Sequence, residues 1–478
     1  PIDHARPPFL VILAPALAVC ARVRGSGSAR RLAKKRRAGR FGQRSVDRRL
    51  LRDLRLAVPG EVRSCTKRLS GGPAIVIWSG GVPDRRRMRF IHTADWQIGR
   101  PFAGIGDQDK RALVKQARLE AIKRIGAVAR DVGADFVVVA GDLFDSTSAD
   151  KATVSAACSA IGQMELPVIA IPGNHDHGGP GSVWEQEFFR REQEALAPKL
   201  AVLLEAAPHE LDSAVVLPCP LMRRTVATDS TEWLRPPAAY SALPDDKPRI
   251  VLAHGSVQVF SGGWDDEAED ITVSNLIDLE RIPEDEVDYI ALGDWHGTKQ
   301  VGPKAWYAGT PEPDRFAKGG DHDPGNVLII DVSRGGVPQV KKERVGKLNW
   351  VEMSFDFAAD DAINGFEELL ASTIGQRAGD DLLRLSLTGS LGIEASNRLG
   401  QVLESLEARL LRVKLSDLTV VAPTDDEIHA LTRGGADPVI AQVARRLVER
   451  AVGDGDEAAV ARVALRELHA VWKQEGAA

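Results

Sequence analysis

Pro172-Gly173-Asn174-His175-Asp176-His177 follows an apolar run, residues 167–171, that predicts a buried strand. Gly173 allows the chain to turn sharply where this strand ends. The next two side chains, Asn174 and His175, then project from the carboxyl end of the strand. Ligands bind at that end of the strands in open α/β sheets. The stretch therefore predicts an α/β fold with a site at this strand end.

Four further apolar runs end in side chains that can bind a metal. They cover residues 90–97, 136–142, 250–255 and 289–296, and they carry Asp95, Asp142, His254, Asp294 and His296 at their ends. Carboxylates and imidazoles at neighbouring strand ends are typical metal ligands, so the five runs predict a metal cluster along one sheet edge. An α/β protein with ordinary polar strand ends is the alternative. The order and spacing of all five runs favour the metal cluster.

The motifs in these runs resemble the pattern of the calcineurin-like metallophosphoesterases, which is D-x-H, G-D, G-N-H-D/E, H and G-H-x-H. Within that superfamily, three stretches most resemble the SbcD-type DNA repair exonucleases. They are His92-Thr93-Ala94-Asp95-Trp96, Gly141-Asp142-Leu143-Phe144-Asp145, and Tyr307-Ala308-Gly309-Thr310-Pro311 with Arg315-Phe316 after it. The resemblance runs from about residue 88 to the C-terminus. It implies a four-layer α/β/β/α sandwich, then a small α/β capping domain and a helical C-terminal tail.

The resemblance also implies two divalent metal ions, with Mn²⁺ expected and Mg²⁺ as the alternative. Carried over position by position, it assigns the first ion to Asp95, Gln97, Asp142 and His296, and the second ion to Asp142, Asn174, His254 and Asp294. Asp142 would bridge the two ions. His175 would bind no metal and would protonate the leaving oxygen. Holding Asn174 in place is its alternative role.

Other polar residues near the motifs have weaker expected roles. His92 and Asp145 are expected to orient the ligands. Asp176 and His177 either share that role or are loop residues. The remaining candidates, His209 and His322, are expected to have no role in the site.

Two positions depart from the superfamily pattern. Gln97 stands where D-x-H has its histidine, and Asp294 stands at the first histidine of G-H-x-H. An amide oxygen binds metal more weakly than an imidazole, whereas the carboxylate of Asp294 is a competent ligand that adds a negative charge. The departures predict a looser first ion and a stricter dependence on manganese.

The composition is that of an ordinary globular protein with an unusual first segment. The 478 residues suit two or three domains, with 44% hydrophobic and 27% charged residues. Residues 1–87 carry 21 Lys and Arg against 5 Asp and Glu, a net charge of +16, and the remainder carries −21. The four cysteines show no C-x-x-C spacing, which argues against a zinc ribbon or disulfide framework and favours the cytoplasm.

Three interpretations of residues 1–87 remain open. The segment is a basic DNA-binding arm, a targeting segment with an apolar run at 8–19, or upstream sequence translated from a misplaced start, with Met88 as the true initiator. We expect it to be non-native or disordered. No stretch is long and apolar enough to predict a membrane span. In the acidic body, the basic residues at 85–89, 223–224 and 299–304 are either DNA contacts or solvated charges, and the acidic loop 265–270 beside Trp264 is expected to be solvated.

The remaining sequence divides into three expected parts. Residues 88–345 are the nuclease domain, 346–424 the capping domain and 425–478 a helical segment. Within the first part, the apolar runs at 201–204 and 214–217 predict strands of a second sheet. The resemblance implies that the helical segment docks on the coiled coil of an SbcC-type ATPase. The apolar stripe of Val439, Val443, Leu447 and Val452 either forms that surface or packs on its own domain.

The sequence therefore predicts a manganese-dependent DNA nuclease of the SbcD type. It would act on DNA ends as a 3′-to-5′ exonuclease, with endonuclease activity left open, together with an SbcC-like ATPase. Whether it forms a homodimer is also left open. A metallophosphoesterase for small phosphodiesters or nucleotides is the alternative enzyme, and the acidic body favours it. A non-catalytic scaffold is a third hypothesis, which Gln97 favours and the retained Asp142, His175 and His254 oppose.

Overall fold

The computed structural model describes residues 13–14, 17–18, 87–257, 275–316, 322–375, 379–422, 424–432, 438–453 and 455–476. The chain forms two compact units, Pro1–Arg85 and Arg86–Ala478. In the first unit, β1 (Leu13–Ala14) and β2 (Leu17–Ala18) pair as antiparallel strands. The other residues of the basic segment up to Arg86, and the acidic loop 265–270, lie outside the described residues.

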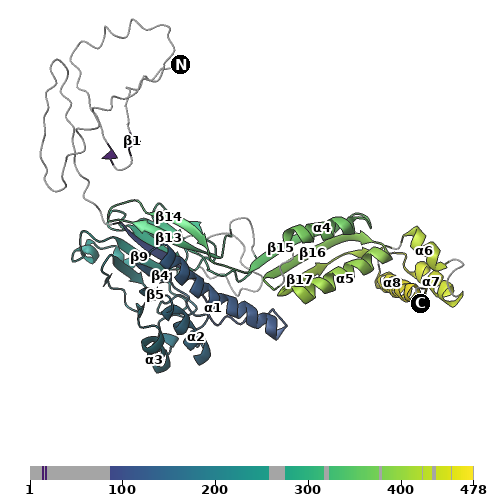
Figure 1. Ribbon diagram of the computed structural model, residues 1–478, viewed down its shortest axis with the longest axis horizontal. Helices are drawn as coiled ribbons and strands as arrows, with labels where there is room; N and C mark the ends of the chain where they lie inside the picture. Colours follow the sequence, from purple (N-terminus) through teal and green to yellow (C-terminus); the bar gives the residue numbers. More distant parts are fainter. Residues whose placement is uncertain are drawn as a thin grey trace, which may run out of the picture. The chain divides into compact units, whose positions relative to one another are not determined.

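The second unit begins with a six-stranded sheet in the order β14-β13-β3-β4-β5-β6 (Figure 1). Its strands are β3 (Met88–Thr93), β4 (Phe136–Ala140), β5 (Val168–Ile171), β6 (Leu200–Val202), β13 (Asn326–Val332) and β14 (Gln339–Arg344). The pairs from β3 to β6 are parallel, and β13 joins β3 antiparallel. The prediction that the run at 201–204 belongs to a second sheet is therefore wrong, because β6 extends the first sheet as an edge strand beside β5.

Three helices cover the outer face of this sheet. They are α1 (Gln108–Asp131), α2 (Lys151–Gly162) and α3 (Glu187–Leu196). Asp107 begins α1 by accepting hydrogen bonds from two backbone N–H groups of the first turn, and Asp150 does the same for α2 through Thr153. The odd-numbered residues Ile91, Val137 and Val139 of the strands pack against these helices.

The second sheet has the order β11-β12-β10-β9-β8-β7. Its strands are β7 (His209–Glu210), β8 (Val215–Cys219), β9 (Arg249–His254), β10 (Tyr289–Gly293), β11 (Lys299–Gln300) and β12 (Ala305–Tyr307). The run at 214–217 forms β8, as predicted. Phe90 and Val138 of the first sheet share one buried cluster with Ile250 and Leu252 of the second, so the two sheets pack face to face.

The predicted α/β/β/α sandwich is confirmed, with a fourth layer that differs from the first. Over the described residues, the helical turns on the outer face of the second sheet are 3-10 turns. They are η4 (Glu232–Leu234), η5 (Pro237–Tyr240) and η6 (Leu279–Arg281). Leu234 and Tyr240 of these turns pack against Leu217 and Val251 of the sheet.

A smaller parallel sheet follows along the chain. It contains β15 (Asn349–Phe357), β16 (Asp381–Leu391), β17 (Arg412–Asp417) and β18 (Val420–Val421), with α4 (Ala362–Thr373) and α5 (Ile393–Arg409) between its strands. Leu383, Leu385 and Leu387 of β16 pack in the same cluster as residues of both helices. The alternate residues Leu382 and Arg384 therefore point to the other face of this sheet.

The chain ends in the helices α6 (Asp425–Thr432), α7 (Pro438–Arg450) and α8 (Asp456–Gly476). Leu447 packs beside the buried residues of this group, but Val439, Val443 and Val452 are 68%, 41% and 81% exposed. The interpretation that the whole stripe packs on its own domain is therefore wrong for these three valines. Among the described residues, none of the helices is long and apolar enough to cross a membrane.

Candidate metal centre

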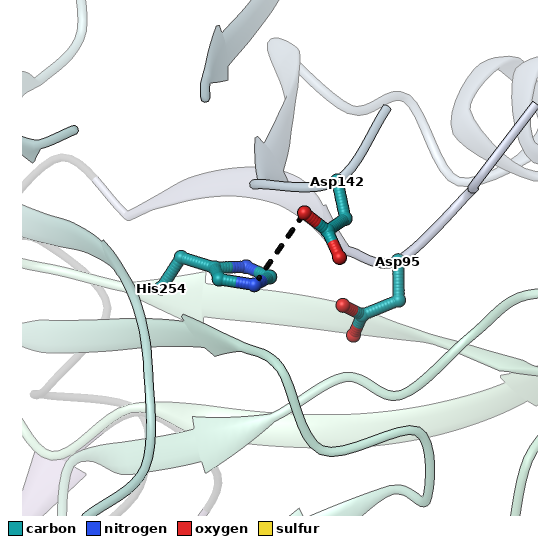
Figure 2. Close-up of side chains that lie close together, drawn as sticks. All are labelled: Asp95, Asp142 and His254. Carbon is teal, nitrogen blue, oxygen red and sulfur yellow. Dashed lines mark ion pairs between the residues drawn. The ribbon is translucent and has the colours of Figure 1, made fainter. Parts of the chain in front are cut away.

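The candidate ligands come from both sheets of the sandwich. Asp95, Asp142 and Asn174 follow β3, β4 and β5 of the first sheet, whereas His254 ends β9 and Asp294 follows β10 of the second. The expectation of one sheet edge was wrong, because β9 and β10, which carry His254 and Asp294, belong to the second sheet. Ligand atoms of Asp95, Asp142 and His254 nevertheless all lie within 4.8 Å of one another (Figure 2).

The backbone at these strand ends adopts a conformation that is rare for residues with a side chain. φ is +54° at Asp95, +42° at Gln97, +55° at Asp142 and +101° at Asp294. Such conformations cost on the order of 1–3 kcal/mol each and cluster at functional sites. They persist here because the two turns are bonded to each other, with Gln97 N–H donating to the Asp142 carbonyl at 2.8 Å.

At two positions the backbone lies so close to a candidate ligand that only glycine fits. A Cβ on Gly141 would lie 2.2 Å from Nδ1 of His254, and one on Gly173 would lie 2.1 Å from Oδ1 of Asp142. Asp176 fixes the Gly173 turn, since its carboxylate accepts from Gly173 N–H at 2.7 Å and Phe144 N–H at 3.0 Å. This is a holding role for the loop, one of the two interpretations that the sequence left open for Asp176.

Two ligand atoms are buried without a hydrogen-bond partner. His254 donates from Nδ1 to the Ala140 carbonyl at 2.8 Å, so in the neutral imidazole the lone pair is on Nε2. Among the described residues, that Nε2 and Oδ1 of Asn174 are buried and have no hydrogen-bond partner. A buried polar atom left unpaired costs about 1–3 kcal/mol. Both atoms are good metal donors, so a divalent cation here would satisfy them, and the donor set fits the ion.

The electrostatics of the centre also fit a cation. Burial, together with the neighbouring Asp142 and Asp294, raises the pKa of Asp95 well above its usual range. Burial likewise raises the pKa of Asp294. Burial opposes protonation of His254, but Asp142 and the other two carboxylates raise its pKa to about 9. A divalent cation would neutralise the same carboxylates and take the place of that proton.

His175 stands beside the centre without joining the buried group. Its backbone N–H donates to Oδ1 of Asp142 at 2.9 Å, and its Nδ1 donates to the Asp145 carbonyl at 3.1 Å. Its Nε2 lies 4.0 Å from Oδ2 of Asp142. The imidazole is thus fixed with Nε2 on the side of the carboxylates, where a proton could be exchanged with a ligand.

The other two candidate ligands of the first ion, Gln97 and His296, contact protein side chains through their donor atoms. Oε1 of Gln97 accepts from Nη1 of Arg100 at 2.6 Å, and its amide nitrogen lies 3.3 Å from Oδ2 of Asp142. His296 places Nδ1 3.1 Å from Oδ2 of Asp314 and Nε2 3.4 Å from the Gln97 amide nitrogen. The structure therefore brings Gln97 and His296 together, but does not aim their donor atoms at a shared ion.

Two polar residues lie near the centre that the sequence reasoning missed. Arg118 is buried and donates to the backbone carbonyls of Asp95 and Trp96, which holds the first strand end. Asp314 is buried beside His296. It lies inside the stretch between Pro311 and Arg315 that carried the resemblance, so the signal was present but no role was attached to it.

The weaker candidates have varied surroundings. His92 bonds to the Tyr289 hydroxyl at 3.0 Å and the Leu292 carbonyl at 3.2 Å, so it ties the two sheets together rather than touching a ligand. Asp145 lies 3.8 Å from Nδ1 of His175. His209 lies in the edge strand β7.

A cavity of about 340 Å³ opens beside His175 and Asp145. Its walls carry five basic side chains and three aromatic ones: Arg100, Arg315, Arg384, Arg412 and Lys414, with Phe102, Phe316 and Trp350. Phe102 and Phe316 share a buried cluster with Leu382 of the smaller sheet, so both parts of this unit form the walls. None of the basic stretches singled out in the sequence contributes a side chain to this cavity.

The arrangement of Asp95, Asp142 and His254 fits a divalent-metal centre at the strand ends of an α/β/β/α sandwich. Residues 88–298 match the family described as Calcineurin-like phosphoesterase. The chain therefore contains a calcineurin-like phosphoesterase domain over these residues, and this domain supports metal-dependent hydrolysis of phosphoesters in general.

Two solved structures are similar to this chain at low identity. TT1561 of Thermus thermophilus shares 14% sequence identity over 54% of this chain and 99% of its own, with a TM-score of 0.34. A second structure shares 11% identity, again over 54% of this chain and 99% of its own, with a TM-score of 0.33. Neither likeness assigns a substrate.

Proposed function

We propose that this chain is a metal-dependent nuclease of the SbcD type that cleaves phosphodiester bonds near the ends of DNA. The observation that carries the proposal is the cavity beside His175. Guanidinium groups neutralise backbone phosphates, and aromatic faces stack on unpaired bases. Arg384, Arg412 and Lys414 supply charge on one wall, and Trp350 supplies an aromatic face.

The net charge of the body does not oppose this substrate. The basic side chains are gathered where a phosphodiester would approach, although residues 88–478 together carry a net charge of −21. Binding to a polyanion depends on such local clusters, because charges beyond about 10 Å are screened at physiological salt. A strand end that enters the cavity would pass His175 and reach the carboxylate cluster.

The roles of the residues follow from their contacts. Asp95, Asp142, Asn174, His254 and Asp294 would hold metal, which when bound supplies positive charge for the phosphate and a nucleophile at neutral pH. His175 would hold a proton at Nε2 for the leaving oxygen, since the Asp145 carbonyl fixes its Nδ1. Arg118 holds the carbonyls of Asp95 and Trp96 and so keeps the first strand end in place.

Substrate preference tests the proposal. The purified chain with Mn²⁺ is assayed on an end-labelled oligonucleotide, on the same oligonucleotide as a duplex, and on bis-p-nitrophenyl phosphate. Replacing Arg384 and Arg412 by Ala should weaken cleavage of the oligonucleotides and reduce the salt dependence of binding by about one phosphate contact per residue. Cleavage of the small ester should persist, because neither residue touches the metal ligands.

A matched control is Arg190→Ala, since Arg190 is an exposed residue of α3 that does not line the cavity. It should leave all three activities unchanged. Efficient hydrolysis of the small ester with no cleavage of DNA would instead favour the small-phosphodiester enzyme. Bound metal without hydrolysis of any ester would favour the scaffold.

We also propose that exposed valines of the C-terminal helical segment, in α7 and directly after it, bind an SbcC-like coiled-coil ATPase, in keeping with a cytoplasmic DNA-repair role. Val439 and Val452 are 68% and 81% exposed, an arrangement that suits the apolar face of a partner helix. Val439→Asp with Val452→Asp should abolish co-purification with the ATPase. The matched control is Val337→Asp, an exposed valine in the turn between β13 and β14. Sedimentation of the chain alone shows whether this face instead forms a homodimer.

A further inference from the structure

We propose that this centre binds one divalent ion tightly instead of two, and that the guanidinium of Arg100 takes the place of the other ion. The two-ion assignment fails at one half only, the half of Gln97 and His296. The number of ions is independent of the proposed nuclease activity. The part played by Arg100 in turnover rests on that activity.

The first step concerns Gln97, whose only metal donor is its amide oxygen. That oxygen accepts a short hydrogen bond of 2.6 Å from Nη1 of Arg100. The amide nitrogen faces two acceptors, Oδ2 of Asp142 at 3.3 Å and Nε2 of His296 at 3.4 Å. Turning the amide over would place its oxygen against both acceptors and its nitrogen against a cation. The contacts therefore select the orientation in which Gln97 presents hydrogens, not a lone pair, to the centre.

The second step concerns His296, which is engaged at both nitrogens. Nδ1 lies 3.1 Å from the Asp314 carboxylate and 3.2 Å from Nη2 of Arg315, and Nε2 lies 3.4 Å from the Gln97 amide nitrogen. The Asp314 carboxylate is the nearest partner of Nδ1 and only accepts, so Nδ1 donates to it. The lone pair that would bind an ion is thus directed at a hydrogen-bond donor of the protein.

The third step concerns the positive charge that already occupies this half. Nη1 of Arg100 lies 3.4 Å from Asp314 and 3.6 Å from Asp145, and Nη2 of Arg315 lies 3.2 Å from Asp314. Two guanidinium groups against the carboxylates of Asp314 and Asp145 leave no net negative charge in this half to attract a second divalent ion.

The other half shows the opposite balance. Asp95, Asp142 and Asp294 surround His254, and no arginine or lysine forms an ion pair with these three carboxylates among the described contacts. Here the unpaired donor atoms of His254 and Asn174 remain. All the features that favour a divalent ion are therefore on one side of Asp142.

Arg100 is placed to act on the substrate that the second ion would otherwise contact. It is 25% exposed and lines the same cavity as His175. Within the described residues, the one side-chain hydrogen bond of Arg100 uses Nη1. The N–H groups on Nη2 and Nε can therefore donate to a phosphate oxygen. A fixed guanidinium aimed at developing charge lowers a barrier by electrostatic stabilisation, as a metal ion does.

The count of bound ions tests the inference directly. Equilibrium dialysis of the full chain against Mn²⁺ should give one tightly bound ion per chain. Electron paramagnetic resonance should show the resolved hyperfine pattern of an isolated Mn²⁺. Two tightly bound ions with the broadened spectrum of a coupled pair would overturn the inference, whether or not the protein cleaves any ester.

Variants of Arg100 test its replacement role. Arg100→Met should keep the single tight ion but lose roughly 10²–10³-fold in turnover, the usual cost of removing one electrostatic stabiliser. Arg100→Lys should recover part of that loss. The matched control Arg190→Met should change neither quantity, and thermal melting should show that all three variants fold. Unchanged turnover of Arg100→Met would remove the proposed role, provided that the wild type is active.

The double variant Gln97→His with Arg100→Met restores an imidazole and removes the competing cation. It should bind a second, weaker Mn²⁺ and give a coupled spectrum at high metal concentration. If it still binds one ion, then Gln97 and Arg100 do not exclude the second, and the structural basis of the inference is wrong. If the wild type binds one ion but hydrolyses no phosphodiester, only the proposed function fails.

Discussion

The two sides of Asp142 differ in what their polar atoms contact. On the His254 side, carboxylates gather around an imidazole, and two buried donor atoms lack a hydrogen-bond partner. On the Gln97 side, every donor of the candidate ligands meets another protein group, and Arg100 and Asp314 complete a neutral network. The comparison teaches that similar residue types at motif positions do not suffice for a metal site. The site also needs lone pairs that the protein leaves unused.

The largest effect is expected on the side with unused lone pairs. His254→Ala removes a donor that faces Asp142 at 3.6 Å, so it should abolish tight Mn²⁺ binding. Turnover should fall by more than the roughly 10–100-fold typical of residues that only support a ligand. Mn²⁺ dialysis and a hydrolysis assay measure both. Full metal binding by the variant would show that the ion lies elsewhere.

A second large effect should separate turnover from metal binding. His175→Ala removes an imidazole beside the centre, the proposed source of the proton for the leaving oxygen, but none of the proposed metal donors. We expect turnover to drop by about 10²–10⁴-fold, the range for general acid–base groups, while the metal content stays the same. The alternative role of His175 is to hold the proposed metal ligand Asn174 in place, and the metal content of the variant tests that role. If metal is lost with His175, the imidazole serves to hold Asn174.

An intermediate effect is expected when one negative charge is removed from the His254 side of the centre. Asp294→Asn keeps the shape of a side chain whose Oδ1 lies 3.8 Å from His254. It should weaken Mn²⁺ binding by about 10-fold and reduce activity even at saturating metal, because one of three carboxylates is lost. A titration of activity with Mn²⁺ reports both changes. An unaltered titration would place Asp294 outside the metal shell.

The smallest effect on metal binding is expected at Gln97. Gln97→Ala removes the hydrogen bond to Arg100 but no donor to the tight ion. The affinity for the first bound Mn²⁺ should change by less than about 10-fold. Calorimetric titration of this variant beside His254→Ala compares the two sides under one set of conditions. Equal losses of Mn²⁺ affinity in Gln97→Ala and His254→Ala would contradict the distinction between the two sides of Asp142.

The sequence predicted the ends of the strands more reliably than their arrangement. Apolar runs that end in Asp95, Asp142 and His254 were recognised because a buried strand and its terminal ligand are adjacent in the chain. Two sheets were predicted, but the strand at which the second begins was misplaced, since nothing local distinguishes β6, which extends the first sheet, from β8, which lies in the second. Pairing between distant strands depends on the packing of the whole core.

The side of Gln97 shows a second limit of the same kind. The sequence indicated that Gln97 is a weak donor, but not that its oxygen is taken by Arg100. Arg100 is only three residues away, yet a left-handed turn at Gln97 is needed to bring the two side chains together. The basic side chains of the cavity beside His175 were also missed, because Arg384 and Arg412 come from strands of the smaller sheet, which lie far along the chain from His175.

Anomalous diffraction at the manganese edge, from crystals grown with Mn²⁺, tests the central distinction most directly. The account predicts one strong peak among Asp95, Asp142 and His254, and no comparable peak between Gln97 and His296. Two peaks of equal height on either side of Asp142, or a single peak at Gln97 and His296, would contradict it.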